Sequence, residues 1–178
     1  MANLSIKRIE VINTVDGRNT LREEPGDAHQ NRGLVFSSRS EGNFSGWRLN
    51  NDETAEFVLG SPDHSVAAQA TGSTNNVGVI GFAAYAERRS LFEDFELGAT
   101  RGGGTYKGVT RGGSLGTGIG DVQSDHVGTT SFMRDGDKPD ILVIGYDLRE
   151  VLVAAGIITP PEPNPFPGTE TGYRKYVK

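Results

Sequence analysis

The chain has 178 residues, a formal net charge of −5 at pH 7 and no cysteine. Its length predicts one domain with a hydrophobic core, and the absence of thiols excludes disulfides, thiolate zinc sites and cysteine nucleophiles. Lysine and arginine are scattered among acidic residues, which predicts no nucleic-acid partner, and no apolar run approaches the roughly 18 residues that predict a membrane span.

Short segments of β-type sequence follow one another through most of the chain, separated by turn signals such as Asp16-Gly17 and Pro25-Gly26. Strands that recur every 10–15 residues or so are typical of antiparallel sandwiches and barrels, so the pattern predicts a mostly β domain. The predicted strands cover residues 4–11, 33–38, 46–49, 56–59, 64–70, 77–87, 91–97, 115–122 and 127–133.

The segment from Gly98 to Gly120 is rich in glycine, with ten glycines among its 23 residues. Threonine, tyrosine, valine and leucine stand between these glycines, rather than the serine, glutamine or lysine of a linker. Glycine within a strand permits a bulge, a sharp corner or a close approach of two backbones. The pattern therefore favours bent and closely packed β-structure.

The last 40 residues or so change character. Residues 140–146 form a continuous apolar strand, and residues 147–156 predict a short helix with Asp147 as its N-cap and Gly156 just past its end. Five of the eight prolines follow within 159–168, which predicts an extended strap on the body or a solvated tail. We expect a β-barrel domain over 1–139 and a strand-helix-strap extension over 140–178.

A series of motifs runs from Gly81 to Leu115: Gly81-Phe-Ala-x-Tyr, Arg89, Phe95-x-Leu, Ala99-Thr, Gly102-x-Gly-x-Tyr-x-Gly-x-Thr, and a new strand at Leu115. This order resembles the allene oxide cyclase-like barrels, and most of all the bacterial spirotetronate cyclases. The resemblance implies an antiparallel eight-stranded barrel that is a homodimer or another homo-oligomer. It also implies a cofactor-independent cyclase that catalyses a (4+2) cycloaddition of a hydrophobic, polyketide-like intermediate in the barrel lumen.

Strand 77–87 has two faces, one with Tyr85 and the other with Phe82. The resemblance places Tyr85 at the ligand as the catalytic residue, whereas hydrophobicity alone favours the Phe82 face. A cyclase of this kind orients its substrate and excludes water, so an apolar wall suffices. The candidate substrate-binding residues, for which ordinary core packing is the alternative, are Phe36, Trp47, Leu115 and Thr117.

Other functions find less support in the sequence. The three histidines, at positions 29, 64 and 126, each lie near an aspartate, but nothing in their spacing predicts convergence on a metal, and we expect them on the surface. We expect no metal and no cofactor, a small hydrophobic substrate, and a cytoplasmic location because no signal peptide is visible. A non-catalytic ligand-binding barrel and a structural, phage-like assembly subunit are the alternatives.

Overall fold

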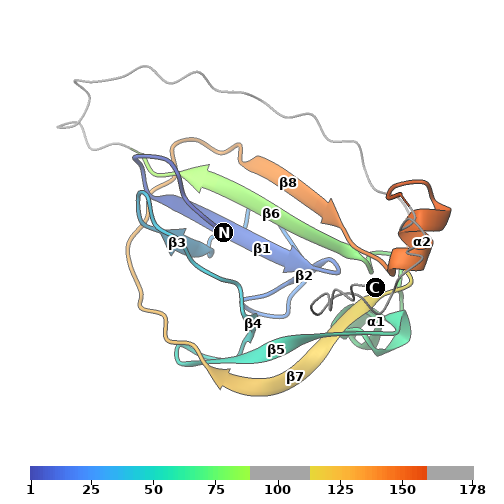
Figure 1. The fold of residues 1–178 in the computed structure, drawn as a ribbon. Helices are drawn as coiled ribbons and strands as arrows, with labels where there is room; N and C mark the ends of the chain where they lie inside the picture. The colour runs from blue at the N-terminus through green and yellow to red at the C-terminus, as the bar shows by residue number, and fades with distance from the viewer. Residues whose placement is uncertain (89–112, 160–178) are drawn as a thin grey trace, which may run out of the picture. The chain divides into compact units, whose positions relative to one another are not determined.

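A computed structural model describes residues 1–88 and 113–159 of the chain (Figure 1). The chain divides into two compact units, residues 1–147 and residues 148–178. The first unit contains two antiparallel sheets, the 3-10 turn η1 (Pro62–His64) and helix α1 (Val66–Thr71). The described part of the second unit contains helix α2 (Arg149–Ala154). The mostly β composition and antiparallel pairing predicted from the sequence are confirmed.

The first sheet has the strand order β2-β1-β6-β8, and β3 also pairs with β1. Its strands are β1 (Ile9–Val15), β2 (Arg18–Asn19), β3 (Leu34–Phe36), β6 (Val79–Ala86) and β8 (Asp140–Gly145). Asp16 and Gly17 form the two-residue turn between β1 and β2, with φ angles of 52° and 75°. A two-residue hairpin turn of this kind needs two left-handed residues, which an Asp-Gly pair adopts readily.

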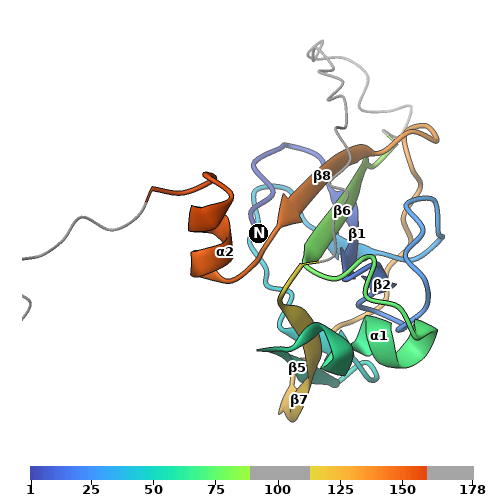
Figure 2. The ribbon, with the colours of Figure 1, turned by 90° about the vertical axis from the view of Figure 1, so that its right-hand side faces the viewer.

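The second sheet has the order β4-β5-β7, with β4 (Gly46–Arg48), β5 (Glu53–Gly60) and β7 (Gly116–Ser124). A register shift between Ala55 and Phe57 marks a bulge in the β5–β7 pair. Gly46 lies so close to β5 that a Cβ atom there would collide with the carbonyl of Ala55. Figure 2 shows the two sheets as separate layers, with α1 beside the second sheet.

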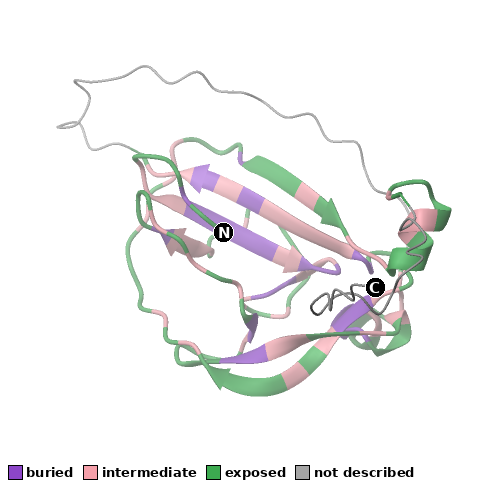
Figure 3. Cartoon of the chain, in the orientation of Figure 1, coloured by how far each residue is buried: buried purple, intermediate pink, exposed green. Residues whose placement is uncertain are grey.

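The main core lies between the two sheets (Figure 3). Trp47 of the second sheet is fully buried and packs edge-on against Phe57, with ring centroids 5.3 Å apart. Val15 and Ile80 of the first sheet and Val66 of α1 belong to the same cluster. This packing fixes which face of each sheet is the inner one, because cross-strand neighbours share a face.

Several predicted strands are confirmed, among them those at 33–38, 46–49, 77–87, 115–122 and 140–146. The prediction of a strand at 64–70 was wrong, since the Ser65 hydroxyl accepts the Ala68 N–H at 3.1 Å and begins α1, which ends at Gly72 with φ 69°. The predicted strand at 127–133 is also absent from the structure. The predicted strand at 91–97 and the proline-rich segment from residue 160 onward lie outside the described residues.

Three boundaries differ from those predicted. Strand β1 begins at Ile9 and continues to Val15, later than the predicted 4–11. Helix α2 has Leu148 and not Asp147 at its N-cap, because the Asp147 carboxylate accepts the backbone N–H of Ser114 at 3.1 Å instead. The sequence assigned strand 140–146 to the C-terminal extension, whereas β8 pairs with β6 inside the first unit.

Within the described ranges, the strand pairs form two sheets and do not close into a barrel. Strands β8 and β7 are edge strands of their sheets within these ranges. No helix in the described part of the chain is long and apolar enough to span a membrane.

Candidate functional site

Tyr85, the predicted catalytic residue, lies on the outer face of the first sheet. Its ring is 2% exposed and clusters with Ile12 and Ala83, against Ala28 and Phe132. Ala28 and Phe132 come from loops that cover the side of the sheet opposite the Trp47 core. The alternation of β6 therefore turns Phe82, and not Tyr85, toward the second sheet, as hydrophobicity alone suggested.

Polar groups surround the Tyr85 ring and hydroxyl. The hydroxyl donates to the Ala28 carbonyl at 3.0 Å and lies 3.2 Å from Nδ1 of His29. The Arg134 guanidinium lies over the ring, 3.9 Å from its centroid, and donates to the Glu10 carboxylate at 2.7 Å. Burial raises the pKa of Tyr85, and the Arg134 charge opposes this rise only in part. The hydroxyl thus anchors a surface loop to the sheet.

Phe36 and Trp47 lie on the inner side of the sheets, so the structure does not bring them together with Tyr85. The Phe36 ring packs against Phe44 at 5.7 Å, and Phe44 packs against Phe82 at 5.8 Å. The Trp47 indole N–H donates to the Gly118 carbonyl at 3.0 Å. Both side chains are buried in close packing of the kind that the sequence left open as an alternative.

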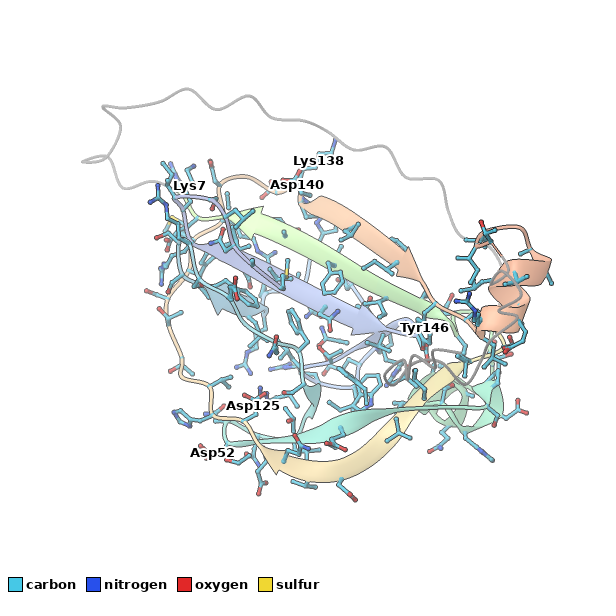
Figure 4. The ribbon with its side chains drawn as sticks, viewed as in Figure 1. Lys7, Asp52, Asp125, Lys138, Asp140 and Tyr146 are labelled. Carbon is cyan, nitrogen blue, oxygen red and sulfur yellow. The ribbon has the colours of Figure 1, made fainter. Side chains whose placement is uncertain are left out.

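Thr117 belongs to a buried polar cluster that joins the two sheets, while Leu115 lies partly exposed just before β7. The Thr117 hydroxyl is 2.6 Å from the Tyr146 hydroxyl, and the Thr117 N–H donates to the Asp16 carboxylate at 2.7 Å. Tyr146 lies at the end of β8 (Figure 4). The cluster connects the first sheet to the start of β7.

Asp16 is the centre of this polar cluster, and sequence analysis identified it only as a turn residue. Its side chain is 1% exposed and also accepts the Gly78 N–H at 2.8 Å and the Tyr146 hydroxyl at 2.6 Å. Three donors therefore hold one buried carboxylate. Burial raises the pKa of Tyr146 well above its ordinary value, and the hydrogen bond to Asp16 is the second cause of this rise. No motif in the sequence links these distant residues.

The inner faces of the two sheets remain apolar and exposed along the edge strands β8 and β7 and at the end of β5. Leu142 and Ile144 of β8 are cross-strand neighbours of Phe82 and Ile80, so they share the inner face. Nevertheless Leu142 is 55% exposed and Ile144 is 44% exposed. Figure 3 shows this exposure along β8 and β7.

The second sheet repeats this arrangement. Ile119 faces Phe57 across the β5–β7 pair, and Leu59 faces Thr117, so both belong to the inner face. Ile119 is 54% exposed and Leu59 is 59% exposed. Val122, which faces the core residue Ala55 across the same strand pair and is 58% exposed, also belongs to the inner face. We call four of the exposed inner-face side chains the inner-edge patch: Leu59, Ile119, Leu142 and Ile144.

The polar surface contains no comparable site within the described ranges. All three histidines are exposed, as expected, and each contacts one neighbouring side chain: Tyr85, Ser61 or Asp52. The part of the chain that the structure describes contains no group of three histidine, aspartate or glutamate side chains that could hold a metal ion. Residues 50–53 line an open polar hollow. Asp52, one of these residues, lies beside Asp125 (Figure 4).

Comparisons with protein-family models, with curated proteins and with solved structures gave no match. The resemblance to the allene oxide cyclase-like barrels stays a prediction that rests on the motifs between Gly81 and Leu115.

Proposed function

We propose that this chain binds a small hydrophobic ligand on the inner-edge patch. The observation that carries the proposal is the exposure of four large apolar side chains on the two faces that turn toward the core. Exposed apolar surface of this kind marks binding sites in soluble proteins. A ligand between the edges of the sheets would cover the patch and extend the core.

The energetics indicate how deeply such a ligand must enter. Covering one half-exposed side chain of this size contributes about 1 kcal/mol to the free energy of binding. The four side chains together therefore contribute about 4 kcal/mol. Micromolar affinity requires about 8 kcal/mol. A tightly held ligand must therefore also contact the partly buried Ile80 and Phe57 behind the patch.

The reaction that we propose for this site is the cycloaddition implied by the resemblance. A (4+2) addition within one polyene forms two carbon–carbon bonds from π electrons, with no change of mass and no proton transfer. An apolar surface that holds the chain folded accelerates such a step by orientation alone. In this proposal Tyr85 does not touch the ligand, because it lies on the outer face.

The closed eight-stranded barrel remains part of this proposal. The described strands would close into a ring only with further pairing between the two sheets, including their edges β7 and β8. A closed ring would enclose the inner-edge patch in a lumen of the size that suits one small ligand.

Ligand binding is tested by titrating the full chain with cis-parinaric acid, a fluorescent polyene that accepts energy from Trp47, the single tryptophan. The substitution Leu142→Gln on the inner face should weaken binding about tenfold, because it removes apolar contact. The control Ile141→Gln changes an equally apolar, 41% exposed neighbour on the opposite face of β8 and should change the affinity less than about twofold.

Two results would contradict the proposal: no saturable binding by the unmodified chain, or an equal loss of affinity in both variants. Incubation with a linear polyene that bears a diene and a dienophile then separates an enzyme from a carrier. A cyclase yields an isomer of identical mass with a new retention time, whereas a carrier returns the polyene unchanged.

A further inference from the structure

A pair of hydroxyl groups borders the inner-edge patch. The Thr117 and Tyr146 hydroxyls lie 2.6 Å apart and connect the start of β7 to the end of β8. Alternate residues of a strand share a face, so Ile119 and Ile144, each two positions from one member of this pair, lie beside it on the inner face. Leu59 lies directly opposite Thr117 in the β5–β7 pair. Most of the patch therefore adjoins the two hydroxyls.

Asp16 determines the direction of the protons in this pair. One oxygen of its carboxylate accepts the Gly78 N–H at 2.8 Å, and the other accepts the Thr117 N–H at 2.7 Å. A carboxylate has no proton to donate, so the Tyr146 hydroxyl, which lies 2.6 Å away, donates its own proton to Asp16. Burial raises the pKa of Tyr146, which keeps this proton on the phenol.

The Thr117 hydroxyl has one arrangement left. Because the phenol proton already goes to Asp16, Thr117 donates within the pair and the Tyr146 oxygen accepts. A hydroxyl has one proton and two lone pairs, and no described residue donates a hydrogen bond to the oxygen of Thr117. At the border of the patch the pair consequently offers acceptors and no donor.

We infer that the ligand of the inner-edge patch is an apolar molecule with a hydroxyl group, which donates to Oγ1 of Thr117 while the apolar part covers the patch. This inference rests on the proposed function, because it specifies the chemistry of the ligand at the same site. An ether or ester oxygen in this place meets only acceptors, and a carboxylate also approaches the charge of Asp16. Both lose affinity, since a polar group that leaves water without a partner is costly.

The alcohol made from cis-parinaric acid and the methyl ether of that alcohol test this chemistry, because they share one fluorescent tail and differ in a single donor. The unmodified full chain should bind the alcohol about tenfold more tightly than the ether, as one hydrogen bond formed away from water implies. Energy transfer from Trp47 reports both titrations.

Substitutions of the threonine separate its oxygen from its shape. Thr117→Val keeps the shape but removes the oxygen, so this variant should bind the alcohol no more tightly than the ether. Thr117→Ser keeps the oxygen and should retain the preference for the alcohol. The matched control is Thr54→Val, because Thr54 is also 2% exposed but lies opposite Arg48, on the face that turns away from the patch. This control should retain the preference.

Tyr146→Phe tests the direction of the protons. The variant removes the acceptor of the Thr117 proton, which then becomes free to donate to the oxygen of the ether. The affinities for the alcohol and the ether should therefore differ by less than about twofold, because Thr117 now serves either partner. A preference for the alcohol as strong as that of the unmodified chain would contradict the proton order derived from Asp16.

Equal affinity of the unmodified chain for the alcohol and the ether would overturn the inference and leave the proposed function in place. Tighter binding of the ether, or a preference for the alcohol that persists in Thr117→Val, would also overturn it. If neither probe binds, the proposed function itself is wrong, and the inference is lost with it. Thermal melting of each variant verifies that the fold is intact.

Discussion

Asp16 illustrates how an acidic side chain is held in an interior by hydrogen bonds. The two backbone donors, Gly78 and Thr117, lie at the starts of two different strands, and the third donor is the Tyr146 hydroxyl. Each donor loses a partner if the carboxylate is removed, and an unsatisfied buried donor costs about 1–3 kcal/mol. The residue therefore contributes to stability chiefly through the groups that it satisfies.

We predict that Asp16→Asn lowers the free energy of unfolding by about 1–3 kcal/mol, because the new amide directs donors at groups that are themselves donors. Urea denaturation followed by Trp47 fluorescence measures the change. Asp63→Asn, at an exposed position in η1, is the control and should change stability by less than about 0.5 kcal/mol. Equal effects at the two positions would show that Asp16 has no special role.

The raised pKa of Tyr146 predicts a dependence of stability on alkaline pH. The unfolded chain releases this proton near pH 10, the ordinary value, while the folded chain retains it. Above pH 10 the folded state therefore binds more protons than the unfolded state. The contribution of Tyr146 to the free energy of unfolding is complete below pH 10 and falls as the pH rises above it. Tyr146→Phe should flatten this decline, as seen in denaturation curves at stepwise higher pH. An unchanged slope would contradict the assignment.

At the scale of single elements, helix α1 depends on its first residue. The Ser65 side chain accepts the Ala68 N–H and donates to the Pro62 carbonyl at 2.7 Å, although the residue is fully buried. Ser65→Ala should lower the free energy of unfolding by about 1 kcal/mol. The control Ser61→Ala removes an exposed hydroxyl that contacts His64 and should have little effect. Thermal unfolding by circular dichroism compares them.

The sequence predicts the positions of the strands better than it predicts the short helix or the pairing of the strands. Continuous apolar runs located both β6 and β8, because such a pattern follows from local geometry. The 64–70 segment looked like a strand because its valine and alanines fit either structure, and the decisive hydrogen bond of Ser65 is a feature of the folded chain. Strand pairing between β8 and β6 depends on long-range register, which no local pattern encodes.

The candidate site was harder to predict from the sequence for the same reason. Phe36, Trp47 and Thr117 were expected beside Tyr85, but the direction of Tyr85 depends on which face of β6 the second sheet covers. Loops that contribute Ala28 and Phe132 give the outer face a small core of its own. Hydrophobicity alone favoured the Phe82 face, which is the inner one, but no local pattern showed that loops also bury Tyr85 on the outer face.

At the scale of the whole molecule, the stability of the first unit depends on the contact between its sheets. Trp47→Ala removes the largest side chain of this core and should lower the free energy of unfolding by about 3–5 kcal/mol. Because the variant lacks the fluorescent reporter, circular dichroism in urea measures it. A small interior does not tolerate a cavity the size of an indole ring, so a loss below about 1 kcal/mol would contradict face-to-face packing.

The hydrogen bond between Tyr146 and Asp16 joins residues that are 130 positions apart in the chain. During synthesis the β1–β2 hairpin, which contains Asp16, leaves the ribosome long before Tyr146 has been made. The carboxylate of Asp16 stays in contact with water until then, and its burial becomes favourable only when the distant phenol arrives. We therefore expect this domain to fold late and slowly, after most of its length has been made, as contacts between distant residues require.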